Sequence, residues 1–461
     1  MKSKRIGTRT VKLENKPTII AASSVVGPKE GEGPLKEHFD LILTDDLYGE
    51  KSWELAESKM VETAMNKAVK KAGKKLEDVN YILGGDLINQ LFPASFAARE
   101  LGVPFFGIYG ACSTMAEGMC LSSMLVDGGF ADLILSGTSS HYCTAERQFR
   151  FPLELGNQKP MTAQWTVTGA GSVLIAPNGK GPKVKYVTVG KVIDKGMDDG
   201  NNMGAAMAPA AIDTIYAYFN DTKDDPNSFD LIATGDLGKL GKQITEDLLK
   251  QKGIDISKVY TDCGIEIFNL EEQDVHCGGS GCGCSATVFA GYIYNKLVNK
   301  EFNKVMLVST GALLSPTSTL QKQTIPCVAH AVVIVNEEWF KMFMEYINAF
   351  LVGGVICLIA QILMDYFKMQ TPYIMVTYVT SGVILTFLGI YEPIVKFGGS
   401  GATVPIIGFG YSLAKGVIKS IKTDGFLGIF LGGTTATAGG IAAAIFFGYM
   451  MAVVFTPKTK P

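Results

Sequence analysis

The sequence predicts an α/β fold made of two duplicated mixed α/β halves, followed by an all-α transmembrane domain. Segments of strand and helix character alternate as far as residue 338, which is typical of parallel sheets covered by helices. Their order recurs within that part, which indicates a duplication. Residues 339–461 contain eight Lys and four acidic residues, and only this stretch has long uncharged apolar runs. We therefore expect three parts, residues 1–182, 183–338 and 342–461.

The first elements alternate between strand and helix. Residues 18–26 form a β-branched strand, and the Gly- and Pro-rich residues 27–34 are expected to form a fixed turn rather than a helix. Ser52 is placed to cap a helix whose apolar residues recur at helical spacing and which Gly73 closes. Residues 79–87 then have the composition of a core strand that runs into a glycine loop.

A glycine-hinged turn at residues 107–114 delivers Cys112 to the start of a helix. A short helix near residues 95–101 and a buried strand at 103–106 precede this turn, and the apolar helix after it continues to Asp127. At such a position the backbone N–H groups and the positive end of the helix dipole favour thiolate over thiol. The alternative is a buried Cys that packs as a small hydrophobic residue.

The order of elements is then repeated. Residues 131–136 and 167–176 complete the strands of the first half. Residues 229–237 repeat the earlier pattern of a core strand that ends in Gly-Asp-Leu, and residues 278–286 open an apolar helix as the Cys112 turn does. A strand at 305–309 follows, so the two halves have the same plan.

Polar residues after two of the elements are suited to an anionic ligand. Arg147 and Arg150, in a polar loop at 144–152, have the geometry to bind a carboxylate through paired hydrogen bonds, with surface ion pairs as the alternative. Asn201 and Asn202 precede the next helix and would add amide contacts, with helix capping as the alternative.

Two α/β halves with a sharp turn before each central helix resemble the thiolase and β-ketoacyl synthase superfamily. In that superfamily the nucleophilic Cys begins the first central helix, a position that Cys112 matches. The resemblance places the catalytic His at His276, before a glycine-rich turn that includes Gly279. Cys277 stands where the superfamily has Pro, and no second catalytic His or Cys is apparent. If the chain is an enzyme, the resemblance implies Cys112 as nucleophile and His276 as acid or base.

Five segments narrow the resemblance to the stage V sporulation protein AD family, which is thiolase-like. They are residues 29–34, 110–114, 144–150, 203–211 and 310–317. The resemblance implies binding of dipicolinic acid (pyridine-2,6-dicarboxylate), free or as its calcium chelate. The ligand-binding residues that we expect are Cys112, Ser113, Arg147, Arg150, Asn201, Asn202, His276 and Gly279.

The tail has the composition of a membrane domain with three or four spans. Residues 343–363 and 373–391 are each about 20 apolar residues, the length that a helix needs to cross a bilayer. Residues 426–455 begin with a glycine-rich segment and continue as an apolar helix. Residues 401–421 form either a fourth span or an interfacial helix. The tail resembles the stage V sporulation protein AE family of membrane proteins.

Location and partners follow from these patterns and resemblances. The basic start lacks an apolar signal segment, so we expect the α/β part on a cytoplasmic face, with reduced thiols. The lysines near the spans then favour three spans. The resemblance implies the membrane of the developing spore, with the lipid bilayer and other stage V sporulation A membrane proteins as partners. A homodimer of the α/β part is a further expectation.

Two classes of function stay open. The first is a binding module that transports dipicolinic acid, and the second is a membrane-tethered acyltransferase that uses Cys112. We expect no cofactor and no nucleic-acid partner. We also expect no metal site, because the spacing of His276, Cys277, Cys282 and Cys284 is not that of paired Cys-x-x-Cys knuckles.

Overall fold

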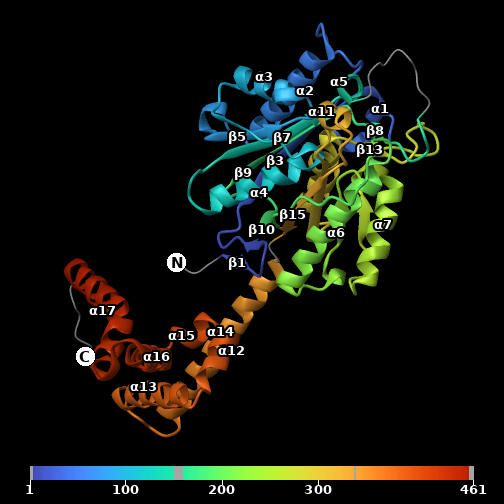
Figure 1. Cartoon of the computed structure of the whole chain (residues 1–461). Coiled ribbons are helices and arrows are strands. Elements are labelled where there is room, and N and C mark those ends of the chain that lie inside the picture. Colours follow the sequence, from blue (N-terminus) through green and yellow to red (C-terminus); the bar gives the residue numbers. More distant parts are fainter. Residues whose placement is uncertain (1–3, 150–158, 337–338, 456–461) are drawn as a thin grey trace. The chain divides into compact units, whose positions relative to one another are not determined.

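The computed structural model describes residues 4–149, 159–336 and 339–455. The chain divides into two compact units, Met1–Glu337 and Glu338–Pro461. The first is called the α/β unit below and the second the membrane unit (Figure 1).

The strand order of the α/β unit confirms the duplicated fold. Five strands of the first half lie in the order β3-β9-β7-β5-β6, and five of the second half repeat it as β10-β15-β14-β11-β12. The two halves meet where Lys183 of β10 pairs with Thr18 of β3. The strands of the first half are β3 (Thr18–Val26), β5 (Tyr81–Gly85), β6 (Phe105–Gly107), β7 (Ile134–Ser140) and β9 (Gly169–Ala176), and those of the second half are β10 (Lys183–Thr188), β11 (Leu231–Thr234), β12 (Tyr260–Asp262), β14 (Lys304–Ala312) and β15 (Cys327–Val335).

Two central helices lie between the halves of the sheet. Helix α4 (Thr114–Asp127) packs against β7 of its own half and against β14 and β15 of the other, whereas α9 (Cys282–Val288) packs against β3, β7 and β9 of the first half. Every residue of α9 is buried. Outer helices cover the sheets: α2 (Trp53–Lys71) and α3 (Phe92–Leu101) in the first half, and α6 (Met203–Thr222) and α7 (Gly238–Gln251) in the second (Figure 1).

Local signals predicted several element ends correctly. The Ser52 hydroxyl accepts a hydrogen bond from the Leu55 N–H at 3.4 Å, so Ser52 caps α2 as expected. Two predicted loops are wrong. Residues 27–34 include a helical turn, α1 (Pro28–Gly31), because Pro at the first helical position has the φ that a helix needs. The polar segment at 144–152 begins inside α5 (Tyr142–Phe149), where buried Glu57 accepts a hydrogen bond from the Thr144 hydroxyl.

The predicted strand at 103–106 is shifted and is only partly buried. It forms β6, the last strand of the sheet order, and the Phe106 side chain is 53% exposed. An edge strand has one side without a neighbouring strand, so its side chains are covered less than the periodicity of the sequence implies.

The parallel strands place their connecting loops together. Strands β5, β6 and β7 are parallel to one another, as are β11, β12 and β14, so the loops after their carboxyl ends gather on one side of each half. Strand β15 runs antiparallel to β14, and its last residue, Val335, pairs with Lys304 at the start of β14. The chain therefore leaves the α/β unit on the side where the parallel strands begin.

The membrane unit is entirely helical where the structure describes it. It contains α12 (Trp339–Asp365), α13 (Thr371–Phe387), α14 (Tyr391–Gly398), α15 (Ser400–Thr403), α16 (Ile406–Asp424) and α17 (Gly428–Val454). By length and composition two described stretches, Tyr346–Asp365 and Ile406–Val454, are apolar enough to cross a membrane. The bent pair α13–α14 makes a third if it counts as one span.

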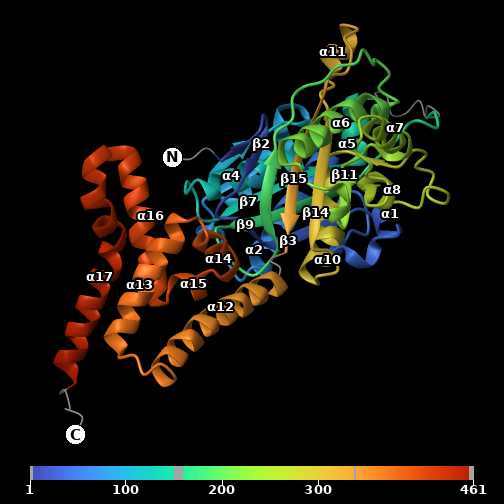
Figure 2. The ribbon, with the colours of Figure 1, turned by 90° about the horizontal axis from the view of Figure 1, so that it is seen from below.

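The second of these stretches folds back on itself, as Figure 2 shows for α16 and α17. Gly425, whose φ of +62° favours glycine, ends α16. A Cβ atom on Gly416 would lie 2.3 Å from the Gly432 carbonyl oxygen, so only glycine allows the two helices to approach this closely.

Candidate functional site

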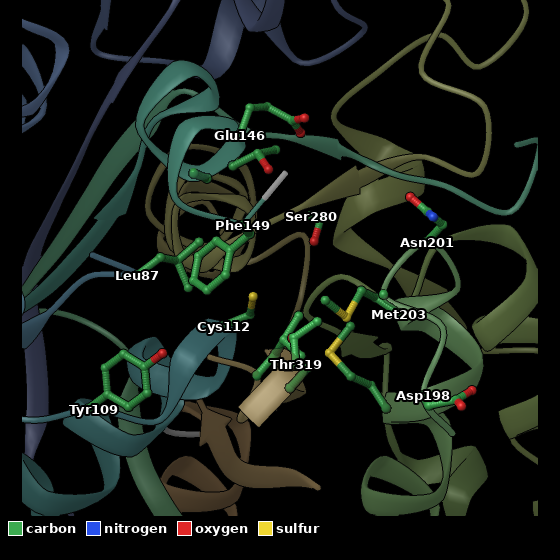
Figure 3. Close-up of a pocket in the computed structure, with 16 residues that line it drawn as sticks. Leu87, Tyr109, Cys112, Glu146, Phe149, Asp198, Asn201, Met203, Ser280 and Thr319 are labelled. Atoms are coloured by element: carbon green, nitrogen blue, oxygen red, sulfur yellow. The ribbon is translucent and has the colours of Figure 1, made fainter. Parts of the chain in front are cut away.

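A cavity of about 170 Å³ opens near the carboxyl ends of the parallel strands of the α/β unit (Figure 3). Both halves of the duplicated fold contribute to its wall. The lining residues are Leu87, Tyr109, Cys112, Ala145, Glu146, Phe149, Thr166, Asp198, Gly200, Asn201, Met203, Met207, Ser280, Ala312, Leu314 and Thr319.

A tightly held turn presents Cys112 to this cavity. Cys112 lies in a short 3-10 turn, Ala111–Ser113, which leads directly into α4. The Ser113 hydroxyl donates to the Gly110 carbonyl at 2.7 Å, and the Thr114 hydroxyl donates to the Ala111 carbonyl at 2.7 Å. From the second half, Gly311 lies so close that a Cβ atom there would be 2.0 Å from the Gly110 oxygen. The turn is therefore fixed by both halves.

The surroundings of Cys112 favour the thiol over the thiolate, in agreement with the alternative of a buried Cys that packs as a small hydrophobic residue. A hydrogen bond with the Cys282 thiol, burial and the nearby negative charge of Asp236 together raise the pKa of Cys112 well above the ordinary value. Cys282 in turn donates to the Ala111 carbonyl at 2.9 Å. The dipole of α4 stabilises a thiolate by a small amount in comparison with these effects, so they outweigh the position of Cys112 at a helix start.

Asp236 is the charged group at the base of the site, and we did not single it out from the sequence. It follows β11, where its carboxylate accepts hydrogen bonds from the Gly281 N–H at 3.0 Å and the Thr310 hydroxyl at 3.0 Å. Burial raises the pKa of Asp236 to about 6. The sequence signal was the repeated Gly-Asp-Leu after the core strand, and the packing of the central helices brings its carboxylate next to Cys112.

No histidine is among the described residues that line the cavity. His276 lies outside it, with its Nδ1 atom 3.8 Å from a carboxylate oxygen of exposed Asp274. Gly279 does not line the cavity either, but it pairs with Trp165 in a two-stranded ribbon and places the next residue, Ser280, in the wall. The structure therefore does not bring His276 together with Cys112.

The predicted arginine anchors have different surroundings. The Arg147 guanidinium pairs with Glu54 and lies 5.5 Å from the centre of the Trp53 ring, so it does not line the cavity. Arg150 lies outside the described residues. Helix α5 instead lines the cavity with Ala145, Glu146 and Phe149, and Lys159 Nζ lies 2.9 Å from Glu146 Oε1.

The predicted asparagines lie at the start of α6. Asn201 lines the cavity, as Figure 3 shows, and Asn202 is the N-cap residue. The Asn202 Oδ1 atom is buried and has no hydrogen-bond partner among the described residues. Ser113, by contrast, is fully buried within the Cys112 turn, so its hydroxyl serves that turn rather than the cavity.

Three helices point their amino ends at the cavity. They are α4 after the Cys112 turn, α6 after Asn201, and the helix that begins with α9 after Ser280 and continues to Val298. The amino end of a helix has free N–H groups and a partial positive charge, so it attracts anions. None of the described lining residues is Lys or Arg, and Glu146 and Asp198 add carboxylates. At the start of α9 the Gly281 N–H already donates to Asp236 and the Gly283 N–H to the Ser140 hydroxyl. Among the described residues, the start of α6 is therefore the amino end whose N–H groups remain free for an anionic group.

Comparison with known proteins gives a family for each unit. Residues 7–335 match the family described as Stage V sporulation protein AD (SpoVAD), and residues 345–454 match the family described as SpoVAC/SpoVAEB sporulation membrane protein. Stage V sporulation protein AD of Bacillus subtilis (strain 168) is 46% identical over 330 residues, which are 72% of this chain and 97% of that protein. Stage V sporulation protein AC of the same organism is 34% identical over 89 residues, 18% of this chain and 59% of that protein.

The comparison with solved structures gives matches of low sequence identity. A variant of OleA from Xanthomonas campestris is 16% identical, with a TM-score of 0.46 and coverage of 70% of this chain and 98% of that chain. The 3-oxoacyl-[acyl-carrier-protein] synthase III from Aquifex aeolicus VF5 is 11% identical, with a TM-score of 0.44 and coverage of 69% and 100%.

Proposed function

Because the chain belongs to the Stage V sporulation protein AD family and continues into a SpoVAC/SpoVAEB sporulation membrane domain, we propose that it binds dipicolinic acid in the Cys112 cavity and serves its transport across the spore inner membrane. Transport would occur during sporulation and germination. The ligand is the free dicarboxylate or its calcium chelate, and the partners are other stage V sporulation A membrane proteins and the lipid bilayer.

The observation that carries this proposal is the amino end of α6 at the cavity, where the first N–H groups of the helix have no acceptor among the described residues. A carboxylate can accept hydrogen bonds from free backbone N–H groups there without a Lys or Arg partner. Apolar side chains of Leu87, Phe149 and Met207 line the same cavity and suit the face of an aromatic ring. The uncharged Cys112 thiol adds no negative charge that would repel the ligand.

Two carboxylates in the wall bear on the form of the ligand. Glu146 and Asp198 would repel a free dianion, whereas they attract a calcium ion that the dicarboxylate already holds. We therefore propose that Asp198 raises the affinity for the calcium chelate relative to that for the free dianion. Asp198→Asn should lower the first affinity more than the second.

Calorimetric titration of the full chain in detergent tests the cavity. Cys112→Leu should abolish dipicolinate binding because the side chain would fill the cavity, whereas Cys112→Ser should retain most of the affinity because size and backbone donors are unchanged. Cys143→Ser, at a thiol that does not line the cavity, is the matched control. Equal affinity of Cys112→Leu and wild type would rule out this site. An acyl adduct on Cys112 after incubation with acyl-CoA, seen by mass spectrometry, would favour the acyltransferase.

A further inference from the structure

The membrane unit contains an ion pair at the middle of helix α16. Lys415 is the central residue of the 19-residue helix α16, about 14 Å from either end at 1.5 Å per residue. Its Nζ atom lies 3.4 Å from Glu392 Oε1, at the start of α14, and both side chains are about half-exposed. Charged side chains are costly within a membrane-spanning segment, and where they occur they usually mark a site of function.

The backbone around this pair is broken. Helices α13 and α14 meet at an angle of 104° across a short break, and Gly399, with φ of +51° and ψ of −122°, separates α14 from α15. In a bilayer such breaks occur only where the backbone is buried in protein or lines a water-filled cavity. The buried Tyr391 hydroxyl donates to the Ala402 carbonyl at 2.8 Å and so satisfies one backbone group of the α15 segment.

A second tyrosine, Tyr411, contacts Lys415. Lys415 Nζ donates to the Tyr411 hydroxyl at 2.7 Å, and the rings of Tyr411 and Tyr391 lie 5.5 Å apart. Tyr411 is 8% exposed, so it holds the ammonium group at a fixed place beside the helix break. At 3.4 Å and half-exposed, the pair with Glu392 is loose enough for another carboxylate to take its place.

We propose that Lys415 is a carboxylate-binding point on the route of anionic solutes through the membrane unit, with Glu392 as the resident counter-ion that the solute displaces. Because Glu392 is only half-buried, its side chain has room to turn away from Lys415 when the solute binds. That the solute is a pyridine dicarboxylate rests on the function proposed above. The carboxylate chemistry of the membrane site rests on Lys415, Tyr411 and Glu392 alone.

Efflux from vesicles tests this assignment. The full chain is reconstituted in phosphatidylcholine vesicles loaded with dipicolinate, or with isophthalate, and released anion is measured against protein-free vesicles. Lys415→Gln should slow efflux of both anions at least about tenfold, because one charge-assisted hydrogen bond is lost. Lys415→Arg should retain most of the rate, and Glu392→Gln should lower the anion concentration that gives half-maximal efflux.

Lys419→Gln is the matched control, since it removes an exposed lysine one turn further along α16. Unchanged efflux in Lys415→Gln, or wild-type efflux no faster than in protein-free vesicles, overturns the assignment. So does a Lys415 effect that appears only when phosphatidylglycerol is added, because the lysine then binds lipid phosphate. Lys415-dependent isophthalate efflux by a chain that shows no calorimetric binding of dipicolinate would uphold this site and reject the function proposed for the cavity.

Discussion

Replacement of Asp236 by Asn should change the pH dependence of folding stability by a predictable amount. Burial raises the pKa of this carboxyl from 3.8 to about 6, a shift of about 2 units. At 1.36 kcal/mol per unit, ionisation of Asp236 opposes folding by about 3 kcal/mol at neutral pH. Because the pKa in the folded state is raised, the stabilising contribution of the proton is complete below pH 3.8 and is lost as the pH rises through 6.

Urea unfolding of residues 1–337 measures this contribution. Asn keeps the shape of Asp and an acceptor for the Gly281 N–H, but it cannot ionise. The stability of Asp236→Asn relative to wild type should therefore increase by about 2 kcal/mol between pH 4 and pH 7. Burial also raises the pKa values of Glu30 and Glu57, but these groups are present in both proteins and their effects cancel in the comparison.

Asp194→Asn, at an exposed carboxyl whose hydrogen bond with Thr324 lowers its pKa, should lack this increase. A stability difference between Asp236→Asn and wild type that stays constant from pH 4 to pH 7 would refute the reasoning. The same substitution has a second effect, because the negative charge of Asp236 raises the pKa of Cys112. Cys112 should then react faster with iodoacetamide in Asp236→Asn than in wild type at pH 8.

Four further outcomes are expected. A fragment that ends at Glu337 should be soluble and monodisperse by light scattering, because the core of the α/β unit is complete at β15. Gly311→Ala should lower the melting temperature and weaken dipicolinate binding in calorimetry, because its Cβ would meet the Gly110 oxygen at 2.0 Å and overpacking costs about 1–3 kcal/mol. Arg147→Ala should leave dipicolinate affinity within about twofold of wild type, since its partner is Glu54. Phe106→Arg should convert the expected homodimer of the α/β unit to a monomer in sedimentation, because this exposed side chain lies on the edge strand β6.

Elements with local signals could be predicted from the sequence. The strand Thr18–Val26 follows from its β-branched composition, and the Ser52 cap follows from the residue before a helical repeat. The duplication was readable because Gly-Asp-Leu follows a core strand twice. In these places the nearest neighbours along the chain decide the conformation.

The details of the site depend on contacts across the fold. The protonation of Cys112 depends on Cys282 and Asp236, which are more than 120 residues away in sequence and arrive only when the two central helices lie between the sheets. The direction of Arg147 is decided by Glu54, on a helix of another part of the first half. His276 matched a glycine turn in sequence, yet the strand ribbon brings Ser280 to the cavity instead.

The short connection between Val335, the end of β15, and Trp339, the start of α12, fixes the stoichiometry of the two units. In Bacillus subtilis the related Stage V sporulation protein AD is a chain that the α/β unit alone nearly covers. Here each α/β unit is synthesised with one membrane unit and cannot diffuse away from it. The two units are therefore made in equal numbers at every level of expression, a balance that separate chains reach only through matched synthesis.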